Sequence, residues 1–131
     1  MVTINDALAF LRHEIRSDFE AREILCFILN SDRAALLSSD RMLQKNEVRQ
    51  IKKFAARRKR GVPLQYILGF WEFYGRRFLV DRRALIPRSD TETLIDAIKA
   101  KNPAAPHFLD LCAGTGIIGL TLEKELSGSG G

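Results

Sequence analysis

Apolar residues recur at intervals of three and four through the first sixty positions of the chain, a spacing that predicts amphipathic helices rather than strands. The first stripe begins at Ile4, and a fourth helix is expected from about Asn46 to Gly61. Each stripe can be buried only against another, so residues 1–62 are expected to form a small helical bundle. The stripes are formed by Ile4, Ala7, Leu8, Leu11, Ile15, Ala21, Ile24, Leu25, Ile28, Leu29, Val48, Ile51, Phe54 and Ala55.

Helix starts within this region carry capping signals. Ser17 and Glu20 stand three positions apart at the start of the second stripe, which predicts a capping box. Asp32 is expected to cap a short third helix through Leu37.

The pattern changes from Pro63, and residues 63–103 are expected to form a connector that consists of a β-hairpin and a helix. An aromatic-rich run that starts at Tyr66 is predicted to form the hairpin, with its turn at Gly75-Arg76. Ser89 and Glu92 predict a second capping box, and the helix behind it is expected to stop near Asn102-Pro103.

The last patterned segment of the chain contains a glycine-rich turn. Residues 107–111 are predicted to be a buried strand, and glycines at 114, 116 and 119 predict a tight turn into a helix. A strand, such a turn and a helix open a doubly wound nucleotide-binding fold. Residues 104–126 are therefore expected to be the truncated start of a cofactor-binding domain, and residues 127–131 a Gly/Ser tail. The fold class expected for the whole chain is mainly α.

Composition bounds the function. With 131 residues, 46% hydrophobic and 28% charged, the chain has the composition of a soluble globular protein. It contains no apolar run long enough to span a membrane and no secretory signal, so a cytoplasmic protein is expected. Cys26 and Cys112 both lie in apolar patterns and are interpreted as two buried thiols. No metal site is expected.

Positive charge is concentrated near the N-terminus. Residues 1–60 contain 13 Lys and Arg against 8 Asp and Glu, and the whole chain has a net charge of +5. Such a face could attract RNA, the ribosome or an acidic protein, although the solvated side of an amphipathic helix has the same composition. The residues that we expect to contact a partner are Lys52, Lys53, Arg57, Arg58 and Arg60.

The turn also carries candidate chemistry. Glycine lets the backbone approach a ligand closely, and the frame Asp-x-Cys-x-Gly-x-Gly places Asp110 four residues before Gly114. This frame resembles the first motif of class I S-adenosylmethionine-dependent methyltransferases, in which the acidic residue lies near the amino-acid end of the cofactor. The alternative for Asp110 is a carboxylate that only stabilises the turn. The expected cofactor-binding residues are Asp110, Cys112, Gly114 and Gly116.

Further blocks, residues 61–69, 72–75, 78–80 and 85–94, resemble the peptide chain release factor glutamine methyltransferases. The resemblance covers residues 1–126 and rests most firmly on the Ile-Pro-Arg segment of residues 86–88 and its spacing to Asp110. It implies S-adenosylmethionine as cofactor, a release factor as partner and methylation of the glutamine in the Gly-Gly-Gln loop. It also implies that Arg88, Thr91 and Glu92 face the cofactor or the substrate, the alternative being a helix cap beside a solvated arginine.

Family members hold the substrate amide with an Asn-Pro-Pro-Tyr motif that this sequence does not contain. No catalytic residue is therefore assigned, and the chain is expected to be an inactive fragment of such an enzyme. Two alternatives stay open: a fragment of a methyltransferase that acts on adenine amino groups in DNA or RNA, and a non-catalytic helical module that binds a release factor or ribosomal RNA.

Overall fold

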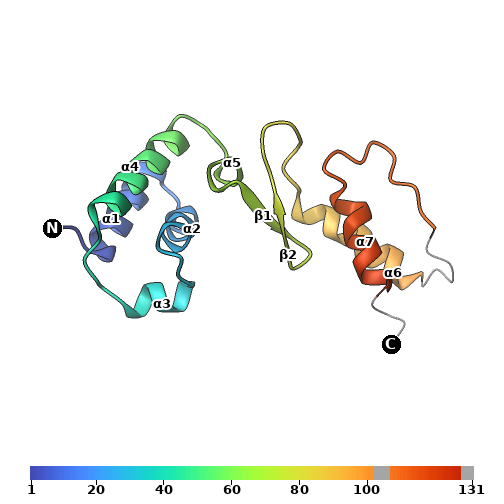
Figure 1. The fold of residues 1–131 in the computed structure, drawn as a ribbon, viewed down its shortest axis with the longest axis horizontal. Helices are drawn as coiled ribbons and strands as arrows, with labels where there is room; N and C mark the ends of the chain where they lie inside the picture. The colour runs from blue at the N-terminus through green and yellow to red at the C-terminus, as the bar shows by residue number, and fades with distance from the viewer. Residues whose placement is uncertain (102–106, 128–131) are drawn as a thin grey trace. The chain divides into compact units, whose positions relative to one another are not determined.

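The computed structural model describes residues 1–101 and 107–127, and the chain divides into two compact units, Met1–Leu68 and Gly69–Gly131. The first unit is helical (Figure 1). It contains α1 (Ile4–Ile15), α2 (Asp18–Leu29), α3 (Arg33–Ser38), α4 (Lys45–Lys59) and α5 (Leu64–Leu68).

The bundle predicted for the N-terminal region is confirmed. Helices α1, α2 and α4 pack against one another, and α5 packs against α2 and α4. The apolar stripes meet in the centre of this unit, where Leu11, Ile24 and Leu25 are fully buried. Burying stripes of this kind is the main source of stability for short helices, which are marginal in isolation. The other buried apolar residues are Ile4, Ala7, Leu8, Ala21, Leu36, Ile51, Ala55, Leu64, Ile67 and Leu68.

The helix caps differ partly from the prediction. The Ser17 hydroxyl accepts a hydrogen bond from the Glu20 N–H at 3.2 Å, so the predicted N-cap of α2 is confirmed. The second half of the capping box is wrong, because the Glu20 carboxylate accepts from the Arg58 guanidinium on α4 instead, at 2.6 Å and 3.0 Å. A charge-assisted bidentate contact is stronger than one neutral backbone contact.

Residues 64–68 are helical, so the prediction of an extended run beginning at Tyr66 is wrong at its start. The Pro63 carbonyl accepts hydrogen bonds from the N–H groups of Tyr66 and Ile67 at 3.1 Å and 3.2 Å. The resulting turn buries Leu64, Ile67 and Leu68 on one face.

The second unit begins with a hairpin of β1 (Phe70–Phe73) and β2 (Arg76–Leu79), in antiparallel register with Phe70 opposite Leu79. Its turn is centred on Tyr74-Gly75, one residue before the predicted position, with φ of 51° and 69°. Two successive positive φ values characterise the turns whose twist matches that of a hairpin.

Two helices complete this unit: α6 (Glu92–Ala100), after a 3-10 turn at Ser89–Thr91, and α7 (Ile117–Ser127). Phe73, Ile95, Ile117 and Leu122 form its buried core. The predicted Ser89–Glu92 capping box is wrong, because the Glu92 carboxylate accepts a hydrogen bond from the Tyr74 N–H at 2.7 Å. The predicted helix stop at residues 102–103 and the start of the 104–126 segment lie outside the described residues. Of the predicted tail at residues 127–131, only Ser127 is described, and it is the last residue of α7 and not part of a tail.

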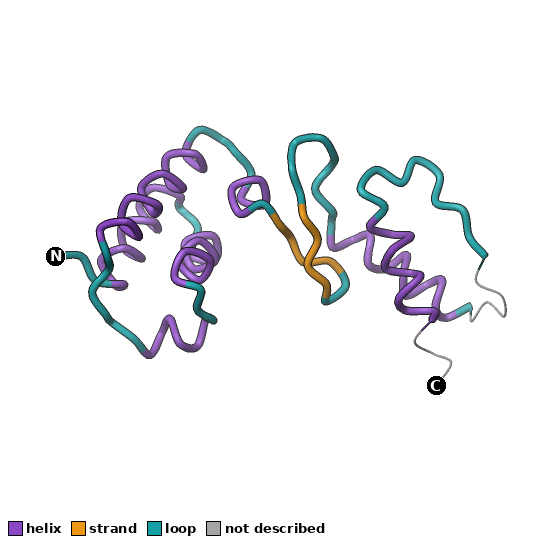
Figure 2. The backbone as a smooth tube through the Cα atoms, viewed as in Figure 1, coloured by secondary structure: helices purple, strands orange, loops and turns teal. Residues whose placement is uncertain are grey.

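The strand predicted at residues 107–111 does not form, although the helix behind it does. Figure 2 shows the described residues before α7 as loop and turn. A strand needs a neighbour with which to exchange hydrogen bonds, and the described sheet has only β1 and β2. Its side chains are correspondingly exposed, Leu109 to 79% and Leu111 to 77%. The helical part of the expected β-α unit is thus present and its strand is not.

We predict that Leu122→Ala lowers the free energy of unfolding of the second unit by about 2–5 kcal/mol, because it leaves a cavity in the core. Leu79→Ala is the matched control, since this leucine is 86% exposed, and it should cost less than about 0.5 kcal/mol. Urea titrations followed by the fluorescence of Trp71, the one tryptophan in the chain, would measure both. Equal losses in the two variants would contradict this assignment of the core.

Candidate functional site

The glycine-rich turn before α7 has an unusual backbone. Cys112, Gly114 and Gly116 have positive φ values of 58°, 58° and 72°. This region is open to glycine but costs roughly 1–2 kcal/mol for a residue with a Cβ, so Cys112 is the one strained position of the three. The Gly116 N–H closes the turn by donating to the Ala113 carbonyl at 2.8 Å. The sequence predicted a tight turn, and the structure has one.

Asp110 joins the loop to the helix that follows it. Its Oδ2 accepts a hydrogen bond from the Gly119 N–H at 3.1 Å, in the first turn of α7. N–H groups in a first helical turn have no partner within the helix, so this carboxylate acts as a cap from outside the usual position. A Cβ at Gly119 would lie 3.2 Å from Oδ2 and 3.5 Å from the Phe108 ring. The third glycine thus permits a close approach within the protein itself, which a larger residue would tighten.

The rest of the turn is open. A Cβ built on Gly114 would have no atom within 4 Å, and Cys112 is exposed. The interpretation of Cys112 as a buried thiol is therefore wrong, because the segment that was to bury it is a loop. Within the described residues, the backbone at Gly114 is thus uncovered, and the half-buried Asp110 carboxylate is the acidic group nearest to it along the turn.

The residues predicted on the substrate side take different roles. Arg88 is exposed in the loop before α6, and Thr91 is half-buried at the helix start. Glu92 is turned toward the hairpin, where it accepts from the Tyr74 N–H. The described hydrogen bonds of Glu92 thus lead to the hairpin and not to the glycine turn.

A polar cluster that the sequence analysis missed fixes α7 within its unit. Glu125 on α7 contacts the Arg76 guanidinium at 2.7 Å and the Lys99 ammonium. Lys99 also donates to the Tyr74 hydroxyl at 3.2 Å, and that hydroxyl donates to Asp96 at 2.6 Å. The hydrogen bonds from Lys99 and Arg76 lower the pKa of Glu125, and the bond to Glu125 raises the pKa of Lys99. No spacing along the chain signals this cluster, because it joins a strand and two helices.

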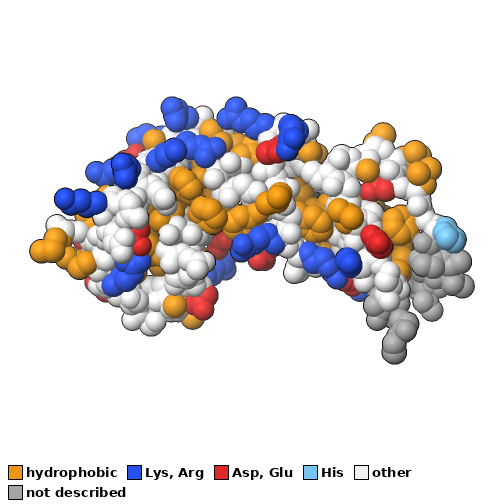
Figure 3. All heavy atoms as spheres, viewed as in Figure 1, with side chains coloured by type: hydrophobic (Ala, Val, Ile, Leu, Met, Phe, Trp, Pro, Cys, Tyr) orange, Lys and Arg blue, Asp and Glu red, His pale blue; other side chains and the backbone are white. Residues whose placement is uncertain are grey.

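The five cations predicted to contact a partner divide into two groups. Arg58 is paired with Glu20, which raises the pKa of Arg58, and Arg57 donates to the Tyr66 carbonyl at 3.3 Å. Both side chains therefore make contacts within the helical bundle. Lys52, Lys53 and Arg60 are exposed and have no ion pair with any residue in the described part of the chain. Figure 3 shows Lys and Arg side chains gathered over α4.

Other classes of site receive no support. Within residues 1–101 and 107–127, no group of three His, Cys, Asp or Glu side chains could hold a metal ion. No helix in those ranges is long and apolar enough to cross a membrane.

Cys26, the other cysteine that was predicted to be buried, is half-buried, and burial raises its pKa.

The sequence of the chain is similar to those of known proteins. Residues 3–69 match the family described as PrmC N-terminal domain. The chain is similar to release factor glutamine methyltransferases of Neisseria gonorrhoeae (40% identity over 81% of the chain and 39% of the relative) and Koribacter versatilis (44%, 80% and 39%). For the protein of that name from Dictyoglomus turgidum, the identity is 35% over 93% of the chain. The chain spans less than half the length of these relatives, 39–46%.

The Glu125 cluster makes stability depend on pH. Because the folded-state pKa of Glu125 lies below its ordinary 4.5, its stabilising contribution is present at neutral pH and is lost as the pH falls through the folded-state pKa. We predict that Glu125→Gln destabilises the second unit at pH 7 and that its difference from the parent shrinks toward pH 3. Urea unfolding at both pH values measures this. Glu123→Gln, at an exposed position on the same helix, is the control, and an equal effect there would contradict the assignment.

Proposed function

Because the chain belongs to the family described as the PrmC N-terminal domain, we propose that it is the N-terminal part of a protein-glutamine methyltransferase that acts on peptide chain release factors. The observation that carries this proposal is the similarity of four-fifths or more of the chain to proteins of that name. A partner that works in translation places the proposed activity in the cytoplasm.

We assign recognition of the release factor to the helical unit. Lys52, Lys53 and Arg60 are its candidates, since their charges are not neutralised within the described part of the unit. Exposed charges of one sign steer a partner of opposite charge and accelerate its encounter. Arg57 and Arg58 are expected to contribute indirectly, by holding α4 in place.

The glycine turn is proposed as the start of the cofactor site. Open glycines let the backbone reach a ligand, and Asp110 would attract the ammonium group of S-adenosylmethionine while it caps α7. Cys112, Gly114 and Gly116 would shape the same edge. Arg88, with Thr91 beside it, is proposed to face the substrate, and Glu92 to position that segment against the hairpin.

The reaction itself needs groups that this chain does not supply. S-adenosylmethionine carries the methyl group as a sulfonium, and the acceptor is an amide nitrogen whose lone pair is delocalised. Positioning and hydrogen bonds to the amide must provide much of the acceleration. The Asn-Pro-Pro-Tyr motif that the resemblance assigns to this task is not in the sequence. We therefore propose that these 131 residues recognise and position, and do not transfer a methyl group alone.

Binding to a purified bacterial release factor tests the recognition role. We predict saturable binding by the 131-residue chain that weakens as salt is raised, because surface charges are screened. A triple variant with Lys52, Lys53 and Arg60 replaced by Glu should lose at least about tenfold in affinity. Lys124→Glu, at an exposed lysine on α7, is the control. No binding by the parent chain, or an unchanged affinity in the triple variant, would contradict the assignment.

Calorimetric titration with S-adenosylmethionine tests the cofactor role. We predict no saturable heat for the 131-residue chain, because the strand expected before the turn does not form and the described sheet contains only β1 and β2, which leaves the turn without the parallel sheet of a cofactor-binding fold. Saturable binding that Asp110→Asn abolishes and Asp90→Asn retains would show instead that the turn suffices as a site. Saturable binding that neither substitution changes would place the ligand elsewhere.

A further inference from the structure

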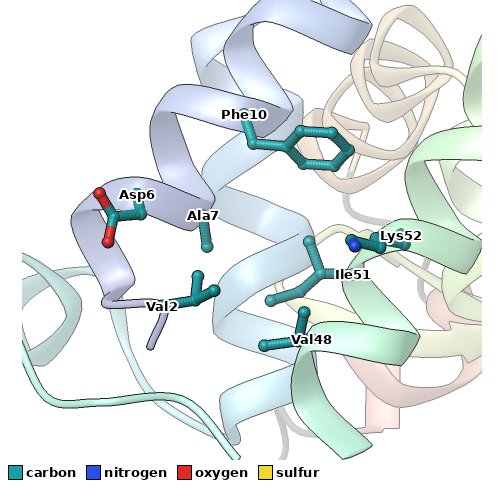
Figure 4. Close-up of a pocket in the computed structure, with 7 residues that line it drawn as sticks. All are labelled: Val2, Asp6, Ala7, Phe10, Val48, Ile51 and Lys52. Carbon is teal, nitrogen blue, oxygen red and sulfur yellow. The ribbon is translucent and has the colours of Figure 1, made fainter. Parts of the chain in front are cut away.

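An apolar hollow lies between α1 and α4 in the helical unit. It has a volume of about 230 Å³ and is lined by Val2, Asp6, Ala7, Phe10, Val48, Ile51 and Lys52. Figure 4 shows Val2, Ala7, Val48 and Ile51 directed toward one another, while Asp6 points away. Water fills such a space poorly, because it needs two to four polar partners there. The volume is several times the roughly 30 Å³ of one water in the liquid and suits a large apolar side chain.

Phe10 is a large apolar side chain of this hollow that the bundle leaves exposed. It is 38% exposed on the same helix that buries Leu8 and Leu11 completely or nearly so. Val2 and Val48 are only half-buried. These three side chains are not among the buried residues of the bundle, so part of their apolar surface is available to a ligand.

The α4 side of the hollow is positively charged. Lys52 lines it, and Lys45, Arg49 and Lys53 lie on neighbouring outward positions of α4. All four are exposed and unpaired within the part of the chain that the structure describes. The one acid that lines the hollow, Asp6, is engaged, because its carboxylate accepts from the Thr3 N–H at 2.9 Å and from the Thr3 hydroxyl at 3.0 Å.

From this combination we infer that the α1–α4 hollow is a docking site for an acidic segment of a partner protein, which inserts one large apolar side chain between Phe10 and Ile51. Carboxylates that flank this anchor meet Lys52 and Arg49. The aliphatic lining favours such a segment over RNA, whose phosphates would use the cations and leave the hollow empty. The inference deepens the proposed function and rests on it for the site of recognition.

The probe is a fluorescein-labelled helical peptide of about sixteen residues with one central leucine flanked by glutamates. We expect fluorescence anisotropy to show binding that falls about tenfold with Lys52→Glu and about tenfold with Phe10→Ser. Lys124→Glu and Phe19→Ser are the controls, since both residues are exposed outside the hollow. Circular dichroism would verify that each variant is folded. A peptide with serine in place of the leucine should bind the parent chain as weakly as the leucine peptide binds the Phe10→Ser variant.

Three outcomes would overturn the docking site. The first two are no binding of the peptide and equal binding of the leucine and serine peptides. The third is displacement of the peptide by a short RNA, together with an unchanged peptide affinity in the Phe10→Ser variant. The same Phe10→Ser variant measured against a purified release factor separates this inference from the proposed function. Unchanged affinity for the release factor removes the docking site and leaves the function standing. If the chain binds the peptide but no release factor, the proposed function is removed and the docking site is left standing.

Discussion

Backbone N–H and C=O groups that leave water need partners, and the second unit satisfies this requirement in three ways. Strands β1 and β2 bond to each other. At the hairpin turn the Tyr74 N–H is taken by the Glu92 carboxylate, and in the first turn of α7 the Gly119 N–H is taken by Asp110. Where no such partner is described, at residues 107–109, the chain stays irregular. The small core of Phe73 and Ile95 depends on these connections.

Acidic residues carry much of the long-range organisation. Glu20 was expected to close a local box around Ser17 and instead binds Arg58, far along the chain on α4. Glu92 and Glu125 likewise bind groups on other elements. A carboxylate has several acceptor positions, and a guanidinium fills two of them at once. Spacing along the sequence cannot show which of these groups will lie nearby after folding.

The sequence predicted the elements that depend on long periodic patterns. Twelve residues of α1 and fifteen of α4 give several turns of one stripe, and both helices were found. The five residues of α5 offer too few positions to distinguish a helix from a strand. The strand at 107–111 was inferred from a motif that presupposes a parallel sheet around it. The glycine turn itself was predicted, since glycine favours the positive φ values at 114 and 116 and permits the close approach at 119.

The two cysteines differ in a way that has a practical consequence. Cys112 is exposed at the glycine turn, whereas Cys26 is half-buried with a raised pKa. The thiolate is the nucleophile that attacks an alkylating reagent, so alkylation at mildly alkaline pH should favour the exposed Cys112. A spectroscopic reporter could thus be attached beside the turn without engineering, and its signal would register directly whether a small molecule or the rest of an enzyme covers that edge.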